Sequence, residues 1–83
     1  MTTVIELIEQ GASRLTEGQV AFGHGTTNAF DEAAWLTLWK LGQPIDGLDD
    51  VADRTVDAAQ IAAVQDLIEQ RIATRKPAAY LTQ

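Results

Sequence analysis

The chain has 83 residues, of which 46% are hydrophobic and 22% charged, as is typical of one soluble globular domain. Its 12 acidic and 6 basic residues give a net charge of -6, which disfavours direct binding to the phosphate backbone of nucleic acids. With no cysteine and a single histidine, the sequence excludes disulfides, thiolate chemistry and multi-histidine metal cages.

The sequence carries no signal for a membrane or for secretion. No apolar stretch approaches the roughly 20 residues needed to span a bilayer. The first residues, Met-Thr-Thr-Val-Ile-Glu, lack the basic start and long apolar core of a secretory signal. We therefore expect a cytoplasmic protein without membrane contact, whose acidic surface serves either a basic partner or solubility.

The first predicted helix begins at Thr3, because Thr3 and Glu6 have the spacing of a capping box. It is expected to end near Glu17, with Gly18 as the left-handed closing residue. Gly11 costs about 1 kcal/mol relative to alanine in a helix, and it marks either close packing or a tolerated glycine. The predicted apolar face consists of Val4, Ile5, Ile8, Gly11, Ala12 and Leu15.

A glycine-framed loop leads into the second predicted helix. The glycines of the Gly-His-Gly-Thr turn permit backbone angles barred to other residues, so His24 is held on a sharply bent chain. Asn28 can accept a hydrogen bond from the free amides of the first helical turn. Asp31 and Glu32 place negative charge at the positive end of the helix dipole.

This second helix is predicted from about Ala29 to Leu41, followed by the stop signals Gly42 and Pro44. Apolar side chains cover most of its circumference, which is typical of a central helix with partners on more than one side. Both tryptophans are therefore expected in the core. Its apolar positions are Phe30, Ala33, Ala34, Trp35, Thr37, Leu38, Trp39 and Leu41.

An acidic connection follows at residues 46–57, with five aspartates and one arginine. The aspartates lack the alternate spacing and closing glutamate of an EF-hand loop, so no calcium site is predicted. Leu48 and Val51 are expected to hold the connection against the core through one short helical turn.

The third main helix is predicted to begin at Asp57, which has Gln60 at capping-box spacing, with Val56 and Ile61 as a hydrophobic staple. Pro77 ends it, and residues 78–82 are expected to be extended. The predicted inner face consists of Ala58, Ile61, Val64, Leu67, Ile68 and Ile72. The basic residues of the last turns complement the negative end of the helix dipole, and they are Arg71, Arg75 and Lys76.

The sequence thus predicts an all-α fold, a small bundle of three main helices with one short added turn. Residues 1–76 form this domain, and residues 77–83 begin an extended linker. No catalytic, cofactor-binding or metal-binding residue is predicted. His24 has neighbouring threonines but no orienting carboxylate other than Asp31, so it either bonds a local backbone group or contacts a substrate or another domain.

Two blocks of the sequence resemble a known family. Residues 22–33 read Phe-Gly-His-Gly-Thr-Thr-Asn-Ala-Phe-Asp-Glu-Ala, and residues 71–82 read Arg-Ile-Ala-Thr-Arg-Lys-Pro-Ala-Ala-Tyr-Leu-Thr. They are similar to the amino-terminal domain of the protein-glutamine N5-methyltransferases, in the branch that modifies the third protein of the large ribosomal subunit. That branch carries Tyr-Gly-His-Gly-Thr-x-Asn-Pro-Trp-Asp-Glu-Ala and Arg-Ile-Pro-Val-Ala-Tyr-Leu-Thr. The chain departs from this pattern at Ala29, Phe30 and Lys76. These substitutions keep the helix start and an aromatic residue.

The resemblance implies a recognition domain separated from a methyltransferase domain that binds S-adenosylmethionine through a glycine-rich loop and carries an Asn-Pro-Pro-Tyr active site. It implies no cofactor in these 83 residues. The implied partners are a basic ribosomal protein and the enzyme's own C-terminal domain. The candidate recognition residues are His24, Thr26, Asn28 and Asp31. The aspartates of residues 46–53 are expected to act as a diffuse attractor, an acidic surface that draws a basic substrate by long-range electrostatics. The residues given a structural role are Gly23, Gly25, Trp35, Trp39 and Pro77.

Two other functions stay open at this stage. One is a free-standing helical module that dimerises or binds a partner helix. The other is an accessory domain of an adenine-specific DNA methyltransferase or of the release-factor glutamine methyltransferases, which share the Pro-x-Ala-Tyr-x-Thr ending but not the Gly-His-Gly-Thr turn. The negative charge argues against a domain that grips DNA.

Overall fold

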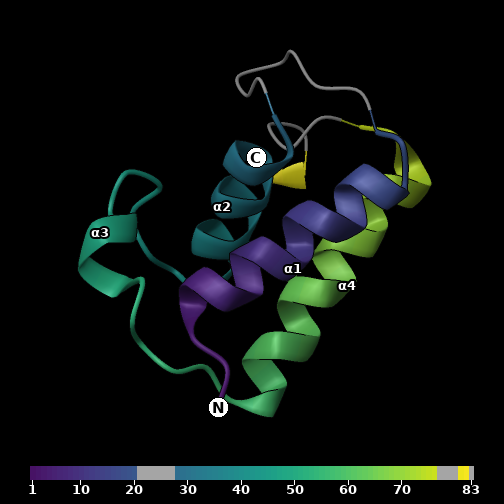
Figure 1. Ribbon diagram of the computed structural model, residues 1–83. Helices are drawn as coiled ribbons and strands as arrows, with labels where there is room; N and C mark the ends of the chain where they lie inside the picture. The colour runs from purple at the N-terminus through teal and green to yellow at the C-terminus, as the bar shows by residue number, and fades with distance from the viewer. Residues whose placement is uncertain (21–27, 77–80, 83) are drawn as a thin grey trace.

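The computed structural model describes residues 1–20, 28–76 and 81–82, and within these ranges it is helical without a strand (Figure 1). The elements are α1 (Val4–Glu17), α2 (Ala29–Lys40), α3 (Leu48–Val51) and α4 (Ala58–Thr74). The predicted bundle of three main helices and one short turn is confirmed. Helices α1 and α4 run in the same general direction and converge toward their C-terminal ends, and α3 stands apart from them (Figure 1).

The start of α1 is fixed both locally and by a distant segment. The predicted capping box is present, with the Thr3 hydroxyl accepting from the Glu6 amide and the Glu6 carboxylate accepting from the Thr3 amide. The Val4 amide donates to the Arg54 carbonyl over 2.9 Å, and the next amide donates to the Ala52 carbonyl over 3.0 Å. All four amides that a helix start leaves free are therefore satisfied, and the segment after α3 is tied to α1.

The core lies where α1, α2 and α4 meet. Gly11 of α1 is buried there, and a Cβ at this position would lie 3.3 Å from Ile68 of α4 and 3.4 Å from Ala33 of α2. The close-packing interpretation of Gly11 is thus confirmed. The buried hydrophobic residues are Val4, Leu7, Ile8, Leu15, Val20, Ala33, Leu36, Leu38, Val51, Val64, Leu67 and Ile68.

The left-handed residue after α1 is Gln19, with φ of 56°, and the prediction of Gly18 at that place is wrong. Gly18 has φ of -75°, which any residue adopts. It is small for a different reason, because a Cβ there would lie 2.9 Å from two carbons of Ile72. The stop after α2 is as predicted, since Gly42 has φ of 74°.

Helix α2 is central, as predicted, but its burial differs from the prediction at four positions. Trp39 and Phe30 are each 38% exposed, so neither belongs to the core. Glu32, predicted as a capping acid of the polar face, is only 1% exposed. Trp35 is half-buried against the core, and Leu36, outside the predicted stripe, is fully buried.

Helix α4 has the predicted Asp57 and Gln60 capping box. Its buried face differs at two residues, since Ala58 is exposed and Arg71 is 2% exposed. Arg71 therefore does not serve mainly as a basic residue at the helix end. Of the residues predicted to be extended, 78–80 lie outside the described ranges, while Leu81 is helical and packs against the core.

Candidate functional site

The N-terminal end of α2 holds the two candidate recognition residues that the structure describes. Asn28 Oδ1 accepts the Asp31 amide over 2.8 Å, and Asn28 Nδ2 donates to Asp31 Oδ2 over 3.2 Å. Both residues are exposed. The predicted cap is confirmed, and the two side chains form one small polar unit at the positive end of the helix dipole.

The other candidates in this loop, His24 and Thr26, lie outside the described residues. The same holds for Gly23, Gly25 and Pro77, so their proposed roles stay predictions.

A buried ion pair lies directly after this cap. Arg71 Nε donates to Glu32 Oε2 over 2.8 Å, and both side chains are only 2% exposed. Two charges withdrawn from water at this depth are tolerated only when they are paired, because an isolated buried charge costs several kcal/mol. The pair fixes the first turn of α2 against the last turns of α4.

This ion pair joins the two sequence blocks that carry the family resemblance. Glu32 belongs to the Asn-x-x-Asp-Glu-Ala end of the first block, and Arg71 opens the second block. Sequence reasoning missed the pair by assigning each charge to the nearest helix dipole. A usable signal was present, because Arg71 lies three residues after Ile68 and seven after Val64, on the inner face of its helix.

The aspartates proposed as an attractor surround α3. Asp49 and Asp50 lie in α3, Asp46 precedes it and Asp53 follows it, and all four are exposed. In the part of the chain that the structure describes, no group of three or more potential ligand side chains is placed to hold a metal ion. None of the described helices is long and apolar enough to cross a membrane.

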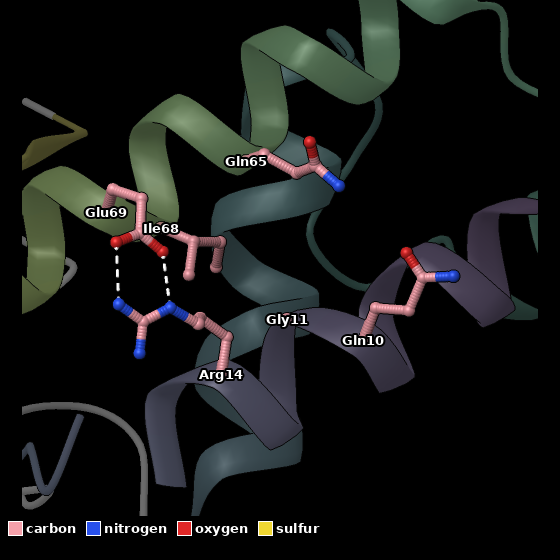
Figure 2. Close-up of a pocket in the computed structure, with 6 residues that line it drawn as sticks. All are labelled: Gln10, Gly11, Arg14, Gln65, Ile68 and Glu69. Atoms are coloured by element: carbon pink, nitrogen blue, oxygen red, sulfur yellow. Dashed lines mark hydrogen bonds and ion pairs between the residues drawn. The ribbon is translucent and has the colours of Figure 1, made fainter. Parts of the chain in front are cut away.

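A hollow of about 240 Å³ lies between α1 and α4 (Figure 2). One end is closed by Arg14 and Glu69, whose two contacts measure 2.7 Å between Nε and Oε2 and 2.8 Å between Nη2 and Oε1. This hydrogen-bonded carboxylate raises the pKa of the Arg14 guanidinium above its ordinary value. The other end is flanked by Gln10 and Gln65 on opposite sides, as Figure 2 shows.

Comparison with known proteins gives one consistent result. The chain is 44% identical over 81 residues to the ribosomal protein uL3 glutamine methyltransferase of Burkholderia pseudomallei, covering 98% of the chain and 26% of that relative. It is 45% identical over 82 residues to the protein of the same name in Bordetella pertussis, covering 99% of the chain and 28% of that relative. It is 42% identical over 81 residues to the protein of the same name in Bradyrhizobium diazoefficiens, covering 98% of the chain and 25% of that relative.

The chain thus spans about a quarter of the length of the curated relatives that it matches. The resemblance to the ribosomal-protein branch of glutamine methyltransferases, indicated by the two sequence blocks, is confirmed. No family model matches the chain, and no solved structure does.

Proposed function

We propose that this chain is the N-terminal, substrate-recognition domain of an S-adenosylmethionine-dependent methyltransferase that methylates a glutamine side-chain amide of ribosomal protein uL3. Residues 1–76 form the recognition domain, and residues 77–83 begin the linker to the methyltransferase domain. The 83 residues themselves are not catalytic. The parent enzyme works in the cytoplasm, with uL3 and its own C-terminal domain as partners and without gripping nucleic acid.

The observation that carries the proposal is the identity of 44–45% over nearly the whole chain to proteins named for this activity. Both sequence blocks of the resemblance lie inside that match. Support for a recognition role comes from charge. The chain carries -6 overall, and ribosomal proteins are basic, so a long-range attraction would speed their encounter.

Methylation by the full-length enzyme tests the proposed activity. Purified uL3, double-stranded DNA and a peptide release factor are offered separately with radiolabelled S-adenosylmethionine. We expect label on a glutamine of uL3 and none on DNA. Label on DNA or only on the release factor would contradict the proposal in favour of the corresponding relative enzyme.

A test of substrate recognition by the α2 cap requires a variant that leaves the stability of the helix unchanged. Asn28→Ala removes the cap and costs about 1 kcal/mol of stability, whereas Asn28→Ser keeps a side-chain acceptor for the first turn. If Asn28 contacts uL3, both variants of the full-length enzyme bind uL3 more weakly than the wild type. If only Asn28→Ala does so, the residue is structural. Asp31→Asn, which keeps the backbone amide that Asn28 caps, tests the neighbouring carboxylate in the same assay.

The attractor role of the exposed aspartates is tested by replacing the four residues at 46, 49, 50 and 53 with asparagine. We expect weaker binding of uL3 at low salt, and a difference that disappears as salt screens the charges. An affinity unchanged at low salt would exclude the attractor.

A second candidate function rests on exposed apolar side chains. Phe30 and Trp39 are each 38% exposed and Ile45 is 50% exposed, and such apolar side chains can contact another domain, a second copy or a partner helix. A free-standing interaction module would use one or more of these side chains without any methyl transfer. The reading frame beyond Gln83 separates the two functions, because a stop codon there is expected only for the free-standing module.

A further inference from the structure

We propose that the hollow between α1 and α4 binds an extended, lysine- and arginine-rich segment of the protein substrate. This inference rests on the proposed function for the identity of that substrate, and it adds a docking site that is separate from the α2 cap. Its lining residues are Gln10, Gly11, Arg14, Gln65, Ile68 and Glu69 (Figure 2).

The floor of the hollow is apolar and closely packed. Ile68 is 3% exposed, and Gly11 is buried at the contact of three helices. Because Gly11 has no side chain, the two helices approach closely at this point and then diverge toward Gln10 and Gln65. A volume of about 240 Å³ is sufficient for a few side chains of a peptide but not for a packed helix or a large cofactor.

The walls offer hydrogen bonds of the kind that an extended backbone can use. The side-chain amides of Gln10 and Gln65 form no hydrogen bond to another described residue, and both side chains are exposed. A primary amide has both donors and acceptors, so it matches the carbonyl and N–H groups of a peptide. The two glutamines lie on opposite sides of an apolar floor, which favours a peptide lying along the hollow (Figure 2).

The charge around the hollow selects a basic occupant. Helices α1 and α4, which form the hollow, expose five acids, Glu6, Glu9, Glu17, Asp66 and Glu69, against the exposed base Arg14, and Arg75 directly after α4 donates to the Gly18 carbonyl. Arg14 is itself matched by Glu69 at the closed end. A second copy of this chain would bring the same acidic face against the first, and an acidic peptide would also be repelled. A cationic segment is the occupant that complements this surface.

The central experiment measures binding of purified uL3 to the full-length enzyme at about 0.15 M salt, where exposed charges more than ~8 Å apart are largely screened. The test variant is Gln10→Lys with Gln65→Lys, which adds two charges of the substrate's own sign at the mouth of the hollow. The control is Thr16→Lys with Gln70→Lys, which makes the same change in net charge at exposed positions of the same helices, outside the lining. Both pairs retain helix-forming side chains, and circular dichroism confirms that both variants are folded.

We expect the test variant to bind uL3 roughly tenfold or more weakly, because amide contacts are lost and like charges are brought together. The control should stay within about threefold of the wild type, since exposed charges are largely screened. Equal weakening of both variants, or no weakening of either, would overturn the docking site. In that case, methylation of uL3 by the wild-type enzyme would still support the proposed function.

A second experiment tests whether the hollow binds a cationic peptide, without using uL3. The probe is an end-capped decapeptide of alternating lysine and alanine, compared with its glutamate counterpart, and the readout is the NMR shifts of the backbone amides and of the glutamine side-chain amides. The lysine peptide should shift Gln10 and Gln65, and the glutamate peptide should not. Shifts confined to residues 46–53 would overturn the inference. If wild-type enzyme ignores uL3 while the lysine peptide shifts both glutamines, the proposed function fails and the cationic site stands.

Discussion

Loss of Arg71 should destabilise the domain far more than loss of Arg14, although both arginines hold a glutamate in almost the same way. The distance from Nε to the carboxylate is 2.8 Å for Arg71 and 2.7 Å for Arg14. The difference lies in burial. The side chains of the first pair are 2% exposed, whereas those of the pair with Glu69 are 44% and 50% exposed.

The magnitude follows from what each substitution leaves behind. Arg71→Met removes the ion pair of the buried Glu32 carboxylate, and breaking a buried pair in this way costs about 3–5 kcal/mol. Arg14→Met leaves Glu69 in water, where an exposed ion pair contributes little to stability. A domain of this length has a total stability of only about 4–12 kcal/mol at the usual ~0.05–0.15 kcal/mol per residue. Arg71→Met therefore removes a large fraction of it.

Urea unfolding of the 83-residue chain, followed by tryptophan fluorescence, measures the effect. With a slope of ~1 kcal/mol per molar urea, Arg71→Met lowers the midpoint by about 3–5 M, and Arg14→Met lowers it by less than about 1 M. The double substitution Glu32→Met with Arg71→Met removes both charges and should recover at least about 2 kcal/mol of the single loss. Equal midpoints for Arg71→Met and Arg14→Met would refute the reasoning, since burial would then have no energetic consequence.

Three further substitutions test the helix ends by the same unfolding measurement. Gly18→Ala should destabilise by about 1–3 kcal/mol, because the new Cβ meets Ile72 at 2.9 Å, and an unchanged midpoint would mean that the isoleucine moves freely aside. Gly42→Ala should cost about 1–2 kcal/mol through its φ of 74°, and no cost would show that the turn relaxes. Hydrogen bonds from the backbone and side chain of Thr3 lower the pKa of Glu6 below its ordinary 4.5, so this carboxylate stabilises the fold above that pH. The advantage of wild type over Glu6→Gln should therefore shrink as pH falls below 4.5 and vanish below the folded-state pKa, and a difference constant with pH would contradict it.

Features determined by neighbours in the sequence were predictable. The capping boxes at Thr3 and Asp57, the asparagine cap at Asn28 and the stop at Gly42 each depend on residues within one turn, and all four are present. The periodicity of apolar residues likewise gave the central position of α2. These signals are local, so they do not need the fold to be known.

Features determined by distant residues were not predictable in the same way. Glycine is the residue type typical of a left-handed cap, but the small size of Gly18 matters because the Ile72 side chain of α4 packs against it. Glu32 and Arg71 are 39 residues apart in sequence, and each has a plausible role at its own helix end. Trp39 shares the helical spacing of a core residue, yet no described element covers it fully, and it remains 38% exposed with Lys40 near its ring.

The position of the buried pair bears on which residues can recognise a substrate. Glu32 and Arg71 are withdrawn from solvent, so a protein partner cannot reach them without opening the core. Their location instead ties the start of α2, where Asn28 and Asp31 are exposed, to the end of α4. A substitution in either sequence block can therefore weaken substrate binding by shifting this junction rather than by removing a contact. Only variants whose unfolding free energy matches the wild type, such as Asn28→Ser, can assign recognition to a side chain.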